Sequence, residues 1–326
     1  MTSNQVDVAF DCPIPIPDQS NIETEYSDDF TRNKIAPIVA GSYAKTNEEI
    51  LGCLNNHFDG PVIYKTYTVP CPGINDTCFG YIAIAEEEKM IFLAFRGSSI
   101  TQYLLENVQF ITFTKVPYPP GGKILDYWSD AFFTIWNSGL SNDLASLLPQ
   151  YQSQDFKLWI TGHSLGGVLA ALSAQYVINN QIYPQNLVKF ISFGEPRIGD
   201  EVFAQIFDNV VPYKYRVINR HDPIPHQPYR LPGQTGNDSF WHHHYEVWYP
   251  QDMCLNANFT ICSRAEDPNC SNSAGANVDP TIKDHAYYFG VSITTWYQDG
   301  CNISDTCHGK ARIKKRIPQN DSPYPI

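Results

Sequence analysis

The sequence predicts an α/β fold, in which a central, mostly parallel β-sheet is flanked by helices. Two observations lead to this expectation. From residue 156 onward, short apolar segments typical of buried strands alternate with segments of helical periodicity, and such alternation is typical of parallel sheets. Near the middle of the chain, a serine between two glycines joins one of these strands directly to a helix.

The individual elements follow from the spacing of apolar residues. Apolar and β-branched runs predict strands at residues 62–69, 81–85, 91–95, 156–161, 187–193 and 213–219. Apolar residues three and four positions apart predict helices at residues 129–148, 165–179 and 201–207. Residues 28–58 are also helical in pattern, and we expect an interruption at Pro37 because proline lacks a backbone N–H.

Composition fits one domain with a large core and polar ends. Of the 326 residues, 43% are hydrophobic and only 17% are charged, so the chain has ample material for a core. We expect an extended N-terminal arm at residues 1–27, a single domain at residues 28–307 and a tail at residues 308–326. The basic cluster at residues 310–316 is expected to be solvated tail rather than a binding patch.

Charge and hydropathy argue against two kinds of partner. The formal net charge is −12, which disfavours nucleic acid. No run of 18 or more apolar residues occurs, so we expect no transmembrane segment. These features leave the oligomeric state open.

The cysteines indicate an oxidising compartment. Nine are present, clustered toward the two ends of the chain: Cys12, Cys53, Cys71, Cys78, Cys254, Cys262, Cys270, Cys301 and Cys307. The short intervals 71–78 and 301–307, flanked by turn-forming residues, suit disulfides better than metal sites. The odd count leaves at least one thiol unpaired in a monomer, and the sequence leaves the pairing open.

Glycosylation sequons favour the same compartment. Six Asn-x-Ser/Thr sequons begin at Asn75, Asn237, Asn258, Asn269, Asn302 and Asn320. Together with the cysteines they predict a secreted glycoprotein. Residues 1–11 lack the apolar core of a signal peptide, so we expect the natural leader to be missing from this sequence.

The chemistry is predicted by Gly162-His163-Ser164-Leu165-Gly166, the one Gly-x-Ser-x-Gly in the chain. An apolar strand enters it and a helix with an apolar face leaves it, which is the setting of the nucleophile elbow in α/β-hydrolases. The serine must stand on a tight turn, and the glycines avoid bulk where strand and helix pass closely. The alternative is a glycine-rich turn with an N-capping serine. We predict an α/β-hydrolase with Ser164 as nucleophile.

A serine nucleophile needs a general base, and the base needs an orienting acid. In this fold the chain order is serine, acid, histidine. Asp222 fits the acid because the strand at 213–219 delivers it to the same rim as Ser164, whereas Asp200 is expected to cap the next helix. The histidines beyond it with room to return are His242, His243, His244, His285 and His308. We choose His285, which stands just before an apolar segment that would anchor it at the rim.

An oxyanion hole needs two backbone donors. One is expected from Leu165, directly after the nucleophile. The other is expected from Ser98, beyond the strand at 91–95, where Gly97 allows a close approach. This mechanism needs no metal and no cofactor. The adjacent residues His242–His244 are expected to pack and hydrogen-bond rather than bind metal, because neighbouring side chains point in different directions.

Five ordered segments resemble those of a known family. They are Phe-Arg-Gly-Ser at 95–98, Thr-Gly-His-Ser-Leu-Gly-Gly at 161–167, Phe-Gly-Glu-Pro-Arg-Ile-Gly at 193–199, Arg-Val-Ile-Asn-Arg-His-Asp-Pro-Ile-Pro-His at 216–226 and Asp-His-Ala-Tyr-Tyr-Phe-Gly at 284–290. In these segments the chain resembles the fungal-type triacylglycerol lipases, or class 3 lipases. The resemblance implies Ser164, Asp222 and His285 as the triad, with Ser98 and Leu165 as oxyanion donors.

The resemblance also implies a short lid helix that opens at a lipid–water interface. The corresponding segment is residues 99–107, in which Ile100, Tyr103 and Leu104 would form the apolar face. This segment is one residue shorter than usual and lacks the tryptophan common in the family, which leaves interfacial activation open. The stretch 127–132 and the cysteine-rich insertion 254–270 are further departures from the family pattern.

The combined prediction is a secreted serine hydrolase that cleaves carboxylic esters of lipids, with a lipid ester as its partner. An esterase acting on phenolic esters of plant polysaccharides and a phospholipase remain open on the same scaffold. The competing class is a binding or storage protein that kept the fold and lost the chemistry. It is disfavoured because all three triad positions carry the required residue types.

Overall fold

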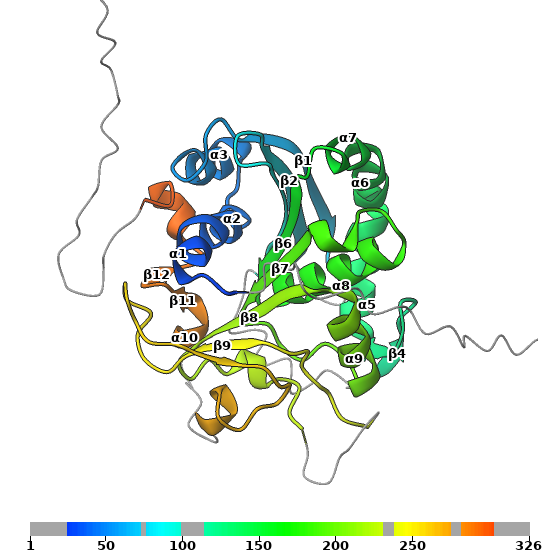
Figure 1. The fold of residues 1–326 in the computed structure, drawn as a ribbon, viewed down its shortest axis with the longest axis vertical. Coiled ribbons are helices and arrows are strands. Elements are labelled where there is room, and N and C mark those ends of the chain that lie inside the picture. Colours follow the sequence, from blue (N-terminus) through cyan, green and yellow to red (C-terminus); the bar gives the residue numbers. More distant parts are fainter. Residues whose placement is uncertain (1–24, 73–75, 99–113, 231–237, 275–281, 303–326) are drawn as a thin grey trace, which may run out of the picture.

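The computed structural model describes residues 25–72, 76–98, 114–230, 238–274 and 282–302, and its centre is an eight-stranded sheet (Figure 1). Its strand order is β1-β2-β3-β6-β7-β8-β9-β10. These strands are β1 Val62–Pro70, β2 Thr77–Ala85, β3 Met90–Phe95, β6 Lys157–His163, β7 Val188–Phe193, β8 Tyr213–Asn219, β9 Glu246–Tyr249 and β10 Thr260–Cys262. Neighbours from β3 to β9 are parallel and the outer pairs are antiparallel. The predicted α/β class with a mostly parallel sheet is confirmed.

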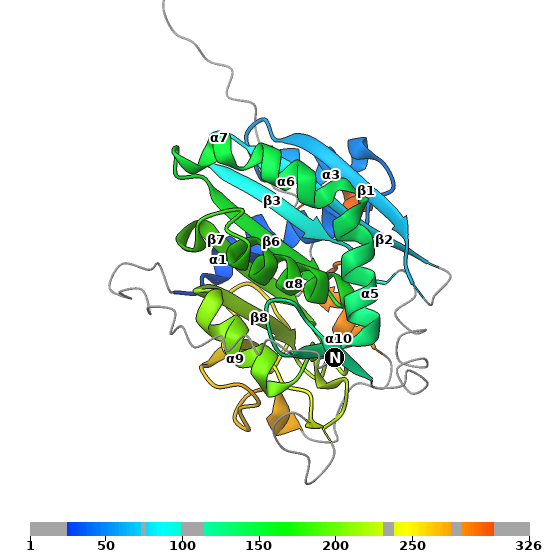
Figure 2. The ribbon, with the colours of Figure 1, turned by 90° about the vertical axis from the view of Figure 1, so that its right-hand side faces the viewer.

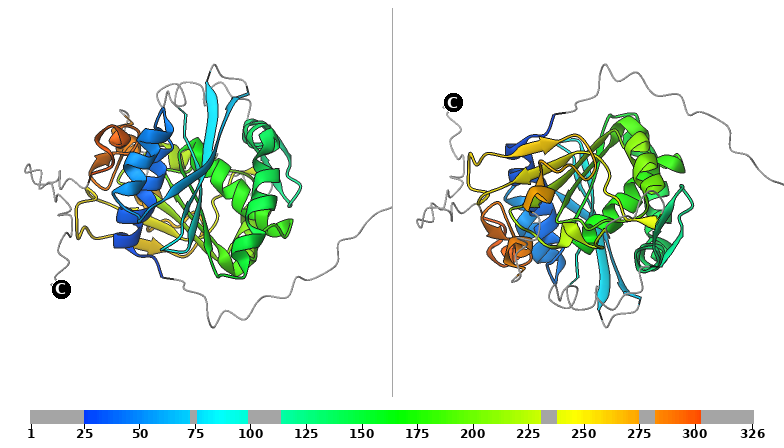
Figure 3. Two further views of the ribbon diagram at one scale, coloured as in Figure 1. Left: turned by 90° about the horizontal axis from the view of Figure 1, so that it is seen from above. Right: turned by 90° about the horizontal axis from the view of Figure 1, so that it is seen from below.

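Helices cover both faces of this sheet (Figures 2 and 3). The described helices are α1 Asp28–Phe30, α2 Ala36–Gly41, α3 Asn47–Asn55, α5 Asp126–Ile135, α6 Ser141–Leu147, α7 Pro149–Gln152, α8 Leu165–Asn179, α9 Glu201–Val210 and α10 Lys283–Ala286. Helices α5, α6, α8 and α9 lie on one face, and α1, α2, α3 and α10 lie on the other. Two small hairpins add β4 Lys115–Pro117 with β5 Lys123–Leu125, and β11 Tyr287–Tyr288 with β12 Val291–Ser292.

The central strands are apolar throughout because both of their faces are covered. Strands β3, β7 and β8 are buried along their whole length. Side chains alternate between two apolar cores, as the two-residue period of a strand requires. In β6, Leu158 and Ile160 enter the core under α8, while Trp159 enters the core under α1 and α2. The continuous apolar runs in the sequence therefore report burial from two sides.

The expected break at Pro37 is wrong. The backbone stays helical from Asp28 to Gly41, and Pro37 follows a π-helical segment at Thr31–Ile35, whose altered hydrogen-bond pattern accommodates a residue without an N–H. The helical path instead ends at Ser42 and resumes after Thr46, whose side chain and that of Glu49 form a capping box at the start of α3. The helix expected at 129–148 is divided among α5, a π-helical segment and α6, with Gly139 at φ 114°.

Three disulfides with both partners described tie the molecule together. They are Cys53–Cys301, Cys71–Cys78 and Cys262–Cys270, and Cys254 is also disulfide-bonded. The expected short loop 71–78 is confirmed, but the one at 301–307 is wrong because Cys301 pairs with Cys53, 248 residues away. Packing explains the difference: the chain before Cys301 lies against α3, where Asn56 donates to the Gly300 carbonyl at 2.7 Å.

Several predictions fall outside the described residues. They include most of the arm at 1–27, the tail at 308–326 with His308, and the proposed lid residues Ile100, Tyr103 and Leu104. The domain boundaries stay predictions. Tyr26, at the end of the predicted arm, is buried and its hydroxyl lies 3.0 Å from that of Tyr249. Within the described parts of the chain, no helix combines the length and apolar character needed to cross a membrane.

Candidate active site

Ser164 stands on a strained turn between β6 and α8. Its backbone has φ 59° and ψ −128°, a conformation that a residue with a side chain rarely adopts and that commonly marks functional sites. Its amide donates to the Phe193 carbonyl of the adjacent strand at 2.9 Å. The side chain is buried, and its hydroxyl has no hydrogen-bond partner among the described residues.

The glycines of the motif are required by backbone contacts. A Cβ at Gly162 would lie 2.1 Å from the Gly166 carbonyl oxygen, and one at Gly166 would lie 2.2 Å from the Phe95 carbonyl oxygen. Both distances are far below van der Waals contact, and the obstructing atoms are backbone. The motif thus reflects three main-chain segments, from β3, β6 and α8, that pass close together around Ser164.

Asp222 and His285 form a buried pair beside this turn. His285 lies on α10, and its Nδ1 is 2.9 Å and 3.0 Å from the two carboxylate oxygens of Asp222. Both side chains are fully buried. With Nδ1–H donating to the carboxylate, Nε2 carries the lone pair, and it has no partner among the described residues. That is the state required of a general base.

Two further donors hold the Asp222 carboxylate. The backbone N–H of Ile224 donates to it at 2.9 Å and the Tyr288 hydroxyl at 2.6 Å. Burial, together with the nearby carboxylate, raises the pKa of Tyr288 well above its usual value, so this hydroxyl keeps its proton and donates. No local pattern predicts this role of Tyr288, although the residue stands in the segment 284–290.

Gly194 brings the end of β7 against the same pair. It has φ +57°, and a Cβ there would lie 2.7 Å from His285 Nδ1 and 2.8 Å from an Asp222 carboxylate oxygen. Only a residue without a side chain lets the backbone approach both groups. The amide of Ser164 bonds to the neighbouring Phe193, so the same loop borders nucleophile, base and acid.

The two predicted oxyanion residues border the nucleophile. Leu165 is the first residue of α8. Ser98 is buried, and its hydroxyl has no partner among the described residues. Its neighbour Gly97 packs on the elbow so closely that a Cβ there would lie 2.6 Å from the His163 carbonyl oxygen and 3.1 Å from Ser164 Cβ.

The rejected candidates have other contacts. The three adjacent histidines point to three different partners: His242 Nε2 to the Pro225 carbonyl at 2.7 Å, His243 Nε2 to Glu195 at 3.2 Å and His244 Nε2 to Asp208 at 3.6 Å. No group of three or more potential metal ligands gathers within the described residues. Asp200 caps α9 by accepting from the Phe203 amide at 2.9 Å, as expected.

A buried ion pair, which no local pattern in the sequence predicts, supports the loop that follows Asp222. Arg197 donates to both carboxylate oxygens of Glu266, at 2.8 and 2.7 Å. The same guanidinium donates to the His226 carbonyl at 2.6 Å and the Pro228 carbonyl at 3.0 Å. Burial alone would raise the pKa of Glu266, but the charge and hydrogen bonds of Arg197 outweigh it and hold that pKa far below its usual range.

Comparison with known proteins agrees with this geometry. The model of the family Lipase (class 3) matches residues 92–231. A lipase of Caenorhabditis elegans is 29% identical over 293 residues, covering 82% of each chain. A lipase of Rhizomucor miehei is 32% identical over 218 residues, which are 65% of this chain and 55% of that protein.

Solved structures share the fold of this chain. The triacylglyceride lipase of Rhizomucor miehei superposes with a TM-score of 0.66 and 27% identity over 84% of this chain and 99% of that chain. In sequence and in structure the chain is similar to the class 3 lipases. The predicted resemblance and α/β-hydrolase fold are therefore confirmed, and the enzyme class is a lipase-type carboxylic ester hydrolase. A further triacylglycerol lipase structure, with a TM-score of 0.67 and 25% identity, has a catalytic centre formed by a serine-protease triad.

Proposed function

We propose that this chain cleaves carboxylic esters of lipids with Ser164 as nucleophile, His285 as general base and Asp222 as orienting acid. One observation carries the proposal. Ser164 is strained and buried and has no hydroxyl partner among the described residues, and the residue before it, His163, packs on the ring of His285 with centroids 4.3 Å apart. The Nδ1 of His285 is held by the Asp222 carboxylate, and its Nε2 is unpaired within the same residues. The triad in the related triacylglycerol lipase supports the same roles.

The steps follow from these positions. His285 Nε2 takes the hydroxyl proton as Ser164 Oγ attacks the ester carbonyl carbon, while Asp222 keeps the imidazole in the required tautomer. The backbone N–H groups of Ser98 and Leu165 donate to the oxyanion. Collapse of the tetrahedral intermediate releases the alcohol, which takes the proton from His285. Water, activated by the same imidazole, then hydrolyses the acyl-enzyme and regenerates the serine.

An acylglycerol is the substrate we propose. The Rhizomucor miehei relative is a triacylglyceride lipase, and a Gibberella zeae protein that is 28% identical over 144 residues is a secreted mono- and diacylglycerol lipase. An Arabidopsis thaliana phospholipase A(1), 29% identical over 170 residues, keeps a phospholipid as the second candidate. Contact of the predicted lid residues Ile100, Tyr103 and Leu104 with the lipid surface stays a prediction.

Secretion is part of the proposal. Disulfides persist in oxidising compartments, and three of them lie within this chain with both partners described. The name of the Gibberella zeae relative describes a secreted protein. Reactivity of all nine cysteines with a thiol reagent in the native protein would contradict this part of the proposal.

Ser164→Ala tests the assignment. We expect kcat for a soluble 4-nitrophenyl ester to fall by roughly 10⁴- to 10⁶-fold with an unchanged thermal unfolding temperature. A fluorophosphonate probe should label the wild-type protein at Ser164 and leave the variant unlabelled. Retention of most esterase activity in the variant would refute the role of Ser164. Turnover of emulsified triacylglycerol, phospholipid vesicles and soluble aryl esters by the wild type separates the substrate classes.

A further inference from the structure

His163, the residue before the proposed nucleophile, is a buried imidazole with hydrogen bonds at both nitrogens. Its Nδ1 lies 2.7 Å from the Tyr43 hydroxyl, and its Nε2 lies 2.8 Å from the backbone carbonyl oxygen of His285. A carbonyl only accepts, so Nε2 carries the proton and Nδ1 accepts from Tyr43. The two bonds reach 120 residues back along the chain and 122 residues forward.

Tyr43 connects His163 to the turn at residues 96–98, which carries the predicted oxyanion donor Ser98 and is called the oxyanion turn below. A hydrogen bond from the backbone of Gly97 to its hydroxyl partly opposes the rise that burial causes in the pKa of Tyr43. The contact is close, because a Cβ at Gly97 would lie 2.4 Å from the hydroxyl oxygen. The hydroxyl therefore lies against the turn before Ser98 and donates to His163.

The imidazole also packs directly on the proposed base. The ring centroids of His163 and His285 are 4.3 Å apart, with 32° between the ring planes. Burial first, and the nearby His285 second, hold the pKa of His163 well below its usual value, so the ring is neutral. A neutral ring is compatible with an imidazolium forming on His285 during the reaction, whereas a second positive charge at this distance would oppose it.

We propose that His163 and Tyr43 are positioning residues that hold the oxyanion turn, the nucleophile elbow and the general base in register with one another. This inference rests on the proposed function of Ser164, Asp222 and His285. Neither residue touches the reacting atoms in this role. They act by fixing three elements whose relative displacement by about 1 Å costs on the order of 10²-fold in rate.

Tyr43→Phe is the primary test, with Tyr81→Phe as its matched control. Both tyrosines are buried against the same helical layer, but the Tyr81 hydroxyl donates only to the Ile38 carbonyl, at 2.8 Å. We expect Tyr43→Phe to lower kcat for 4-nitrophenyl butyrate by about 10- to 100-fold with little change in KM. Tyr81→Phe should lose comparable thermal stability and keep its kcat. Equal kcat in the two variants would overturn the proposal.

Two substitutions of His163 distinguish its hydrogen bond with Tyr43 from its hydrogen bond with the His285 carbonyl. Glutamine reaches the position of Nε2 and keeps a donor for the His285 carbonyl but loses the acceptor for Tyr43, whereas asparagine reaches the position of Nδ1 and keeps that acceptor. We expect the kcat losses of Tyr43→Phe and His163→Gln to be non-additive, because both break one bond, and those of Tyr43→Phe and His163→Asn to add. Additive losses in the first pair would contradict the chain of bonds.

The outcome is separable from that of the proposed function. If wild-type Ser164 is not labelled by the fluorophosphonate, the proposed function fails. If Ser164 is labelled and Ser164→Ala is inactive, but Tyr43→Phe matches Tyr81→Phe, only the positioning role fails. Should the His163 variants not fold, the two tyrosine variants decide the matter alone.

Discussion

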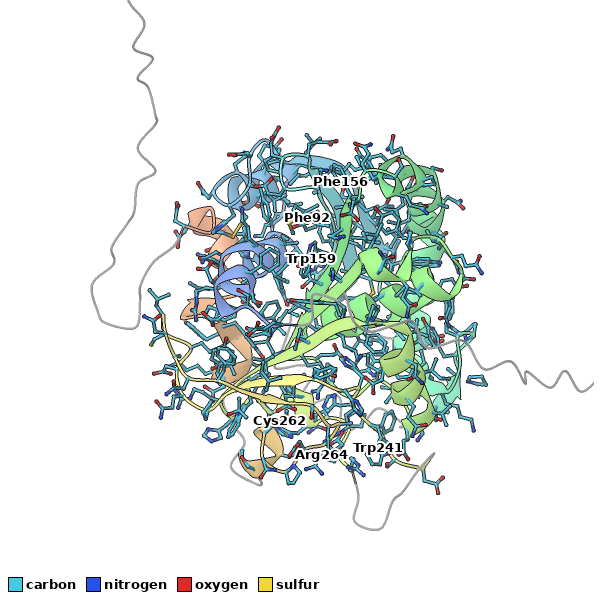
Figure 4. All side chains as sticks on the ribbon, in the orientation of Figure 1. Phe92, Phe156, Trp159, Trp241, Cys262 and Arg264 are labelled. Carbon is cyan, nitrogen blue, oxygen red and sulfur yellow. A yellow bond between two sulfur atoms is a disulfide. The ribbon has the colours of Figure 1, made fainter. Side chains whose placement is uncertain are left out.

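The elbow at residues 157–179 and the C-terminal region at residues 246–302 contribute to one site in different ways. The elbow is a contiguous strand, turn and helix, in which Gly162 and Gly166 are explained by backbone contacts around Ser164. The described residues of the C-terminal region form few long elements and are held by contacts to distant parts of the chain. Figure 4 shows its Cys262 and Arg264 at the end of the molecule away from Phe92 of β3.

The contacts of the C-terminal region show what this difference means. Cys301 is joined to Cys53 across 248 residues, and Glu266 to Arg197 across 69. His285 itself reaches Asp222 across 63 residues. Local backbone geometry thus positions the nucleophile Ser164. The positions of His285 and of the loop after Asp222 depend instead on hydrogen bonds, an ion pair and a disulfide between residues far apart in the chain. Substitutions in the two regions should therefore fail in different ways.

The largest expected effect is in the elbow. Gly162→Ala places a methyl group 2.1 Å from a backbone oxygen that cannot move without displacing α8. We expect a loss of more than about 4 kcal/mol in the free energy of unfolding, measured by urea denaturation.

Gly52→Ala is the control for that substitution. Its new Cβ would have only the Gly300 Cα within 4 Å, at 3.9 Å, and it lies inside α3. We expect it to be neutral or to stabilise by about 0.5–1 kcal/mol. Equal stability of the two variants would show that the elbow is less tightly packed than these distances require.

Removing the buried charge of Glu266 should be the next largest effect. Glu266→Gln leaves the Arg197 guanidinium without its counterion, and we expect a loss of about 3 kcal/mol at pH 7. Because the folded-state pKa of Glu266 is depressed, its stabilisation is present above the unfolded pKa near 4.5 and is lost as pH falls. The deficit of the variant should therefore shrink in acid.

Asp252→Asn is the matched control for the charge effect. Its ion pair with Arg220 lies in the same region but is exposed, so we expect a loss below about 1 kcal/mol. Urea denaturation of both variants between pH 7 and pH 3 measures the contrast. If the loss in the free energy of unfolding caused by Glu266→Gln is no larger than that of Asp252→Asn, or grows in acid, the pairing of Arg197 with this carboxylate does not stabilise the fold.

Apart from the control variants, the smallest expected effect on stability comes from the disulfide that closes the loop around Glu266. Replacing Cys262 and Cys270 by serine should cost about 2.5 kcal/mol from loop closure. The Cys71–Cys78 pair closes a loop of similar length, with a separation of 7 residues against 8, so its double variant should lose about as much.

Activity separates the two disulfides. We expect only the 262–270 variant to lower kcat for a soluble ester, because Glu266 lies within its loop and bonds to Arg197, which holds the carbonyl groups that follow Asp222. Equal kcat in the two double variants would mean that this loop stabilises the fold without orienting the acid.

The sequence by itself determined the elbow and the sheet around it. Alternating apolar strands and helical segments predicted the parallel sheet, and the helix at 165–179 begins and ends as expected. These features depend on neighbours in the chain, so their periodicity and turn residues carry the information. The choice of Asp222 and His285 needed more, namely the fixed chain order of the fold and the resemblance of segments 216–226 and 284–290.

Only the tertiary structure decided which distant side chains meet. No periodic or local signal in the sequence predicts four of these contacts. They are the hydrogen bonds of Tyr288 to Asp222 and of Tyr43 to His163, the ion pair of Arg197 with Glu266, and the disulfide of Cys53 with Cys301. Each contact depends on how separate helices and loops pack on the two faces of the sheet. A hydrogen bond or a disulfide forms only within a few ångströms, and such distances between remote residues are set by packing of the whole core rather than by any segment of the sequence.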